Sequence, residues 1–172
     1  MSQVIQAGLY IVDGQILEAN SFLKQYFDQE IDELALGMIR KFPDREKVLT
    51  ASIKAHKEKN YYLSIPVFYS QAEGICQELT AIRFFTIKKG KPKTSSIVDK
   101  FTGSGLTLDL LQPLNLISSN RQVQNFENPI DANRHDIMHG QSTDYGEDEF
   151  VSYKALSLLT YVTDVVFDAT QK

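Results

Sequence analysis

The sequence predicts a single all-α domain, a helical bundle, and three observations indicate this fold. Apolar residues recur at intervals of three and four along several stretches, which is the spacing that gathers them on one face of a helix. The most apolar stretch, near the C-terminus, lacks two-residue alternation and is too long for a typical strand. The chain has 172 residues, of which 42% are hydrophobic and 23% charged, so it can bury one core. No internal repeat or domain boundary divides residues 1–172.

The N-terminal part is expected to contain two helices after a short extension. Residues 1–18 place Gly8 and the turn pair Asp13-Gly14 between apolar runs, which predicts a small extension or hairpin. A helix is predicted over residues 20–39, and a second over residues 44–59 with Asp44, after Pro43, as its N-cap. The apolar face of the first of these helices comprises Leu23, Phe27, Ile31, Leu34 and Met38.

A long helix is predicted from Tyr62 to Ile82, and shorter elements follow it. Pro66 lies in its first turn or two, where proline starts or kinks a helix rather than ending it. Residues 88–93 are predicted to form a basic loop. Residues 94–101 and 106–117 are predicted to form short helices, and a polar loop is expected over residues 118–128. The apolar stripe of the long helix comprises Ile65, Phe68, Tyr69, Ala72, Ile75, Cys76, Leu79 and Ile82.

Two further helices are expected near the C-terminus. After Pro129, one carries residues 133–140, with Asp131 as its cap and Gly140 at its C-terminal end. The last helix spans about six turns by its spacing. Its apolar positions are Val151, Ala155, Leu158, Leu159, Val162, Val165 and Val166.

Charge and composition narrow the class of protein. The net charge of −4 disfavours general nucleic-acid coating, which needs a basic field. The single cysteine, Cys76, excludes an internal disulfide and reads as a buried, inert thiol. No apolar run approaches the roughly 18 residues that cross a bilayer, and no basic segment precedes an apolar one at the N-terminus. We therefore expect a cytoplasmic protein with no membrane partner.

The segment from Asn133 to Gly140 carries the most informative chemistry. It holds two of the three histidines, His135 and His139, beside Arg134. Arginine offers a planar fork for phosphate, and histidine moves protons near neutral pH, so the segment suits phosphodiester chemistry. Arg134 and His139 lie about 140° apart on an ideal helix. They can bracket one phosphate only if the helix start is distorted or if a second copy of the chain completes the site.

The same residues resemble a known signature. Arg134, polar His135, three residues and then His139 resemble the R-polar-x-x-x-H signature of the HEPN family, whose all-helical domains are often ribonucleases of bacterial defence and toxin–antitoxin systems. Residues 45–168 are similar to one uncharacterised bacterial subgroup of that family, which has Asn where Val151 stands. The segments that carry this similarity are residues 55–62, 65–66, 71–75, 133–140, 145–146 and 154–155.

The resemblance implies a metal-independent endoribonuclease without a cofactor, built by two chains around one composite site. Arg134 would bind the scissile phosphate, His139 would act in acid–base catalysis, and His135 would orient the reacting groups. Asn133 would cap the helix or contact phosphate. Glu73 would bind the Arg134 or His139 side chain without contacting the substrate and so orient it. RNA, a second copy of the chain and an antitoxin protein are the partners that it implies.

Four lysines and two further residues complete the set of candidates. The concentrated positive charge at Lys88, Lys89, Lys91 and Lys93 would guide the RNA backbone, although a solvated basic loop explains it equally well. Tyr145 and Lys154 are expected to hold the loop after Gly140.

Other functions remain open on the sequence. Arg134 and the histidines can serve as helix-cap and salt-bridge residues in a purely structural dimer. A HEPN dimer can instead hold nucleotide, RNA or a partner protein without cutting it. The pair His135 and His139 also resembles the zinc-binding H-E-x-x-H motif, with Asp136 in place of the glutamate, but no third ligand follows at a familiar spacing.

Overall fold

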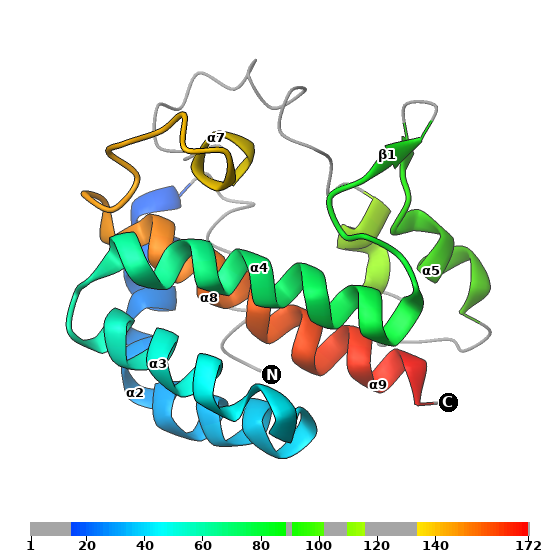
Figure 1. The fold of residues 1–172 in the computed structure, drawn as a ribbon, viewed down its shortest axis with the longest axis horizontal. Coiled ribbons are helices and arrows are strands. Elements are labelled where there is room, and N and C mark those ends of the chain that lie inside the picture. Colours follow the sequence, from blue (N-terminus) through cyan, green and yellow to red (C-terminus); the bar gives the residue numbers. More distant parts are fainter. Residues whose placement is uncertain (1–14, 89–90, 102–109, 116–133, 172) are drawn as a thin grey trace.

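The computed structural model describes residues 15–88, 91–101, 110–115 and 134–171, and helices dominate these ranges (Figure 1). Within them the only sheet is a pair of two-residue strands. The predicted all-α single domain is therefore confirmed. The helices form because apolar residues at three- and four-residue intervals give each of them one side that packs inward.

Two long helices form the centre of the fold. Helix α4 (Tyr61–Thr80) lies along α8 (Glu149–Tyr161), and this pair makes the most extensive helix–helix contact among the described residues (Figure 1). Helix α8 continues into the π-helical turn η4 (Val162–Val166) and then α9 (Phe167–Thr170). Helix α2 (Ile16–Lys41), the 3-10 turn η1 (Pro43–Arg45) and α3 (Glu46–Lys57) pack against the central pair.

Smaller elements lie beyond the C-terminal end of α4. Strands β1 (Ile87–Lys88) and β2 (Lys91–Pro92) pair antiparallel, with Ile87 opposite Pro92. Helix α5 (Ser95–Lys100) and the 3-10 turn η2 (Gln112–Asn115) follow, and the Thr94 hydroxyl donates to the Leu114 carbonyl at 2.7 Å. The short helix α7 (Arg134–Met138) lies over α4, on the side away from α3 (Figure 1).

The core runs along the facing sides of α4 and α8. Cys76 lies in it, fully buried, and burial raises the pKa of its thiol to about 11, so the predicted inert role of this residue agrees with its environment. The largest completely buried side chains are Phe68, Phe84, Met38, Leu49, Ile65, Ile75, Leu111, Leu114, Leu156, Leu159, Val162 and Val166.

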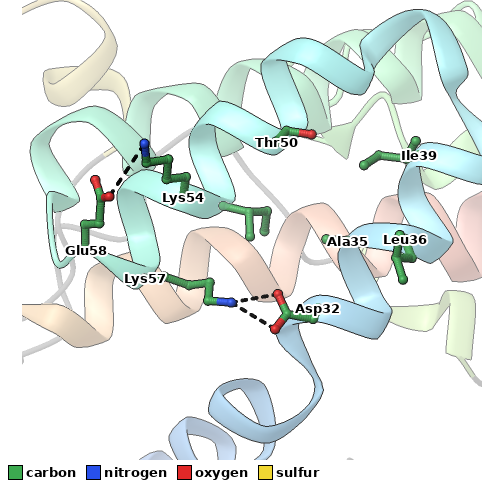
Figure 2. Close-up of a pocket in the computed structure, with 9 residues that line it drawn as sticks. Asp32, Ala35, Leu36, Ile39, Thr50, Lys54, Lys57 and Glu58 are labelled. Carbon is green, nitrogen blue, oxygen red and sulfur yellow. Dashed lines mark hydrogen bonds and ion pairs between the residues drawn. The ribbon is translucent and has the colours of Figure 1, made fainter.

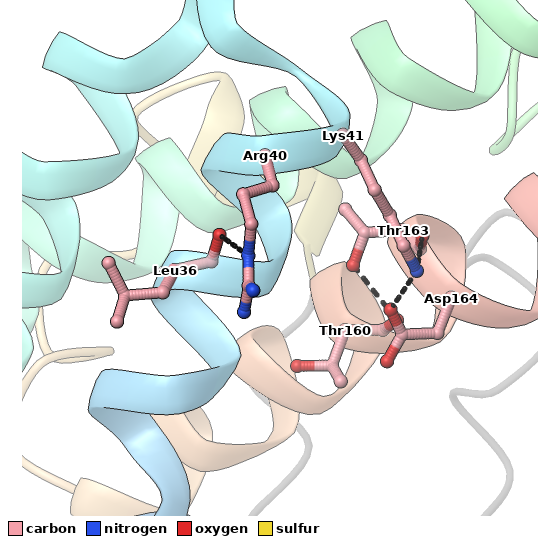
Figure 3. Close-up of polar contacts among 6 residues, drawn as sticks. All are labelled: Leu36, Arg40, Lys41, Thr160, Thr163 and Asp164. Carbon is pink, nitrogen blue, oxygen red and sulfur yellow. Dashed lines mark hydrogen bonds and ion pairs between the residues drawn. The ribbon is translucent and has the colours of Figure 1, made fainter.

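The π-helical turn is held by a lysine from another helix. Lys41, in the last turn of α2, donates to the Thr163 carbonyl at 3.0 Å and pairs with the Asp164 carboxylate at 2.6 Å (Figure 3). A π-turn displaces carbonyl groups from their usual partners four residues along the helix. The ammonium group of Lys41 gives the Thr163 carbonyl a donor and thereby fixes α2 against the end of the C-terminal helix.

Several predicted boundaries are wrong, and each has a local reason. Asp44 is not an N-cap, because Pro43 starts a 3-10 turn and α3 begins only at Glu46, with Arg45 at its N-cap position and no side-chain cap bond. Helix α2 begins at Ile16, so residues 16–18 are helical rather than part of a hairpin. The segment predicted as a basic loop, residues 88–93, includes Lys88 of strand β1 and all of strand β2.

Other expectations fall partly or wholly outside the described residues. They include the rest of the N-terminal hairpin over residues 1–14, the loop over residues 118–128, and Pro129 and Asp131. Of the helix predicted over residues 106–117, the described part ends in the 3-10 turn η2. Helix α7 begins at Arg134, and nothing is described of the chain immediately before it.

One helical stretch, Glu149–Thr170, is long and apolar enough by length and composition to cross a membrane, with a mean hydropathy of 1.3. The sequence was expected to hold no such stretch, because charged residues such as Lys154 interrupt its apolar run. Half of this stretch is buried inside the fold against its neighbours. A central core helix needs the same apolar composition, and the packing of α8 on α4 accounts for it.

Candidate functional site

Gly140 terminates helix α7, as the sequence predicted, and the last helical residue is Met138. The Gly140 amide donates to the Ile137 carbonyl at 3.2 Å, and the Gln141 amide donates to the Asp136 carbonyl at 2.7 Å. This is the Schellman pattern, which requires a left-handed residue, and Gly140 has φ of 69°. His139 therefore lies at the C-cap position, one residue after Met138, and its side chain is exposed.

Arg134 is turned the other way, toward α4. Its guanidinium pairs with the Glu73 carboxylate and lies over the Phe85 ring, 4.3 Å from the ring centroid. The side chains of Arg134 and Glu73 are only 17% and 25% exposed. Glu73 thus contacts one of the two partners expected for it. The ion pair and the ring together fix α7 on α4, since both partners of Arg134 come from α4 or from the segment directly after it.

One atom of this arginine stands out. Arg134 Nε is buried and has no hydrogen-bond partner among the described residues. A buried N–H without an acceptor costs free energy, and such a group in a folded protein calls for an explanation. The guanidinium therefore keeps donor capacity that Glu73 does not use.

The two histidines meet on one face of α7. Their ring centroids are 4.3 Å apart and the planes are tilted by 53°, so the predicted shared face of His135 and His139 is confirmed. His135 is partly buried and His139 is exposed. Arg134 and His139 do not converge within one chain, because one faces α4 and the other faces solvent.

Tyr145 holds the loop after Gly140, as expected. Its hydroxyl donates to the Tyr62 carbonyl at 3.0 Å, and the two rings meet edge to face at 5.2 Å. Gly146 must lack a side chain here, because a Cβ would lie 2.6 Å from the Tyr62 ring. The loop between α7 and α8 is thereby fastened to the first turn of α4.

The remaining described candidates lie at two places, on and beside the strand pair and on α8. Lys88, Lys91 and Lys93 are exposed on and beside the strand pair, which begins two residues after Phe85 and so follows the ring that supports Arg134. Lys154 is exposed on α8 and lines a small pocket between α2 and α8, together with Phe27 and Tyr153. Lys89 and Asn133 lie outside the described residues.

A groove between α2 and α3 holds none of the predicted site residues. Ala35, Leu36, Ile39 and Ile53 supply its apolar lining, and its volume is about 610 Å³. Two ion pairs lie along its rim, Lys57 with Asp32 at 2.8 Å and Lys54 with Glu58 at 3.8 Å (Figure 2). Helix α3, which forms one wall of the groove, lies on the side of α4 opposite α7 (Figure 1), so the groove is separate from the arginine–histidine segment.

Metal ligands in groups of three are absent from the described ranges, since no cluster of three or more His, Cys, Asp or Glu side chains occurs there. The zinc-protease motif that His135, Asp136 and His139 resemble therefore finds no third ligand in this part of the chain.

A buried polar network was missed by the sequence analysis. His56, on α3, lies with Nδ1 2.8 Å from the Ser152 hydroxyl, which is 2.9 Å from the Ser64 hydroxyl. The His56 ring also meets the Tyr153 ring edge to face at 4.7 Å, and the Tyr153 hydroxyl donates to the Asp28 carboxylate. The signal was present in the sequence, because His56 follows Leu49 and Ile53 at the spacing of the buried face.

The stability of the fold is expected to fall as the pH drops from 7.5 to 5.5. Burial lowers the pKa of His56, against the opposing charges of Asp28 and Glu149. Below about pH 6.5 the His56 side chain binds a proton in the unfolded chain but stays neutral in the folded chain. The free energy of unfolding therefore decreases as the pH falls. Urea unfolding at the two pH values measures this decrease.

The double variant His135→Gln/His139→Gln is the matched control and is expected to retain this decrease, because His56 is still present. In the folded protein, the NMR signal of the His56 ring should titrate below about pH 6.5, the usual value for histidine. A His56 ring that titrates at or above that value would contradict its assignment as a buried neutral group.

Comparisons of the chain with protein-family models, curated proteins and solved structures find no match. Function is therefore inferred from the residues and their contacts alone.

Proposed function

We propose that the chain is a metal-independent endoribonuclease of HEPN type, acting as a homodimer. The observation that carries this proposal is the pair of imidazoles on α7, exposed at His139 and adjoining an arginine that Glu73 and Phe85 hold in a fixed position. General acid–base catalysis needs an imidazole within reach of the substrate, and charge stabilisation needs a preorganised cation.

The proposed reaction uses no group from outside the protein and the RNA. One imidazole accepts the proton of the ribose 2′-hydroxyl, and the 2′-oxygen attacks the neighbouring phosphorus. The bond from phosphorus to the 5′-oxygen breaks, and that oxygen takes up a proton from an imidazolium, so one proton is accepted and one is returned. The products are a 2′,3′-cyclic phosphate and a 5′-hydroxyl end. His139 is assigned to proton transfer, His135 to orientation of the reacting groups, and Arg134 to the charge on the phosphoryl oxygens.

The directions of the side chains support the proposed homodimer. Within one chain Arg134 faces α4 while His139 faces solvent, so a single copy does not direct both groups at one phosphate. Two copies related by a twofold axis would bring two exposed His139 side chains to one interface. The exposed Lys88, Lys91 and Lys93 add positive charge that can attract the RNA backbone.

The experiment that tests the proposal uses the purified full-length chain. Incubation with total bacterial RNA in excess EDTA is expected to yield fragments with 2′,3′-cyclic phosphate ends. The oligomeric state of the same sample, measured by light scattering, is expected to be a dimer. A folded dimer that leaves all RNA intact, together with tight RNA binding, would support a noncatalytic binding module instead.

The noncatalytic function is a second candidate because of one observation. Arg134 is mostly buried and already engaged by a carboxylate and an aromatic ring, which is how a structural arginine behaves. In that case α7 presents its histidines as a docking surface for nucleotide, RNA or a partner protein. A toxin or phage-defence role, with an antitoxin as partner, belongs to the first candidate and requires the cleavage activity.

A further inference from the structure

The chain offers very few side chains that bind soft or borderline metal ions. It contains three histidines and one cysteine, and all four lie in the described ranges. His56 and Cys76 are buried in the core, and the His56 ring nitrogen Nδ1 already contacts the Ser152 hydroxyl. A divalent transition-metal ion arriving from solvent therefore meets imidazole only at His135 and His139.

The imidazole rings of His135 and His139 lie next to each other. They lie four residues apart on α7, with ring centroids 4.3 Å apart, and the Schellman turn at Gly140 fixes the end of the helix beneath them. Two nitrogens bound to one tetrahedral zinc ion lie about 3.3 Å apart, given a bond length near 2.05 Å. Rings in contact reach that separation by rotation about χ2, which is a soft torsion.

Metal binding would occupy only one ring nitrogen of each histidine. A metal-bound imidazole uses one nitrogen, and the other keeps its own hydrogen bond, which orients the ring. The exposure of His139 leaves room for water to fill the remaining positions around the ion. Two protein ligands with two waters make an exchangeable site, in contrast to the closed four-ligand sites of structural zinc.

We propose that His135 and His139 form a two-histidine site for a divalent transition-metal ion, represented by Zn²⁺, and that the bound ion inhibits the chain. The metal takes the imidazole lone pair that His139 needs in order to accept a proton. The inhibition rests on the proposed ribonuclease function, whereas the binding of zinc does not. The site differs from a zinc-protease centre because it lacks a third protein ligand among the described residues.

Zinc binding is measured without RNA, by competition between the full-length protein and a chromophoric zinc indicator. The wild type is expected to bind one Zn²⁺ per chain. His135→Ala and His139→Ala should each bind more than about tenfold more weakly, since even changes outside the ligand shell cost that much. Gln141→Ala, an exposed position just beyond the helix, is the matched control and should bind as the wild type does.

Circular dichroism at the concentrations used checks that each variant is folded. Equal zinc affinity in the wild type and in either folded histidine variant would overturn the site. Zinc binding by the wild type that is no tighter than zinc binding by His135→Gln/His139→Gln would also overturn the site.

The inhibition is tested separately on RNA. Cleavage that proceeds in EDTA, stops at saturating Zn²⁺ and returns with excess EDTA is the expected result. Cleavage that continues unchanged at saturating Zn²⁺ would overturn the inhibition while leaving the ribonuclease in place. Zinc binding without any cleavage in EDTA would overturn both the ribonuclease and the inhibition, and would leave the metal site standing.

Discussion

His139→Ala is expected to cleave RNA at least about a hundredfold more slowly than the wild type in excess EDTA, because removal of a general acid–base group costs 10²–10⁴-fold. The unfolding midpoint in urea should stay close to that of the wild type. His139 is exposed at the end of α7, and surface substitutions away from special contacts change stability little. Initial rates on one defined RNA substrate, with end-group analysis of the products, provide the measurement.

Gln141→Ala is the matched control, since it removes an exposed side chain two residues further on and leaves both imidazoles in place. It should cleave at the wild-type rate. Wild-type cleavage by His139→Ala would remove this residue from the mechanism. A loss shared equally by His139→Ala and Gln141→Ala would point to the surface of α7 rather than to proton transfer.

Arg134→Lys is expected to lower both activity and stability, although it keeps the positive charge. Lysine lacks the planar fork that stabilises phosphoryl oxygens and cannot lie flat on the Phe85 ring. Loss of one preorganised donor typically lowers kcat by about 10²–10³-fold. Loss of the ring contact should lower the free energy of unfolding by about 0.5–2 kcal/mol. Arg83→Lys makes the same change at an exposed position and should alter neither quantity.

The two candidate functions diverge in this experiment. A purely structural Arg134 predicts a loss of stability with cleavage, or RNA binding, at the wild-type level once the variant is folded. A double-mutant cycle with Arg134→Ala and Glu73→Ala separates the part of the stability effect that passes through their ion pair. Coupling of about 0.5–3 kcal/mol is typical of residues in direct contact. A coupling near zero would contradict the role of Glu73 in holding α7 on α4.

The regular helices could be predicted from the sequence because their apolar spacing directly reflects which face is buried. The prediction over residues 20–39 falls within α2, and that over residues 62–82 nearly matches α4, with Pro66 inside its second turn. The predicted cap at Asp44 is wrong, because an acidic residue after a proline suggests a cap, while the chain forms a 3-10 turn there. The strand pair could not be predicted from the sequence, because strands of two residues each show no periodicity of apolar residues.

The candidate site was predicted only in part. The shared face of His135 and His139 follows from their four-residue spacing, and the role of Gly140 follows from the need for a left-handed residue. The contact between Glu73 and Arg134 joins residues 61 positions apart, so the sequence offered it only as one of two options. The ring of Phe85 beneath Arg134 could not be foreseen, because nothing in a linear pattern aligns a loop aromatic with a distant arginine.

The π-helical turn at Val162–Val166 makes the number of residues in the C-terminal helix matter. A π-turn takes up one residue more than an α-turn, so a deletion of one residue within it would restore ordinary helical winding and leave the residues downstream facing as they do now. Phe167, whose ring meets Phe42 edge to face at 5.6 Å, would keep that contact. A deletion elsewhere in the helix would instead turn everything downstream by about 100° around the axis. Related sequences should therefore carry any length difference in this helix at that turn.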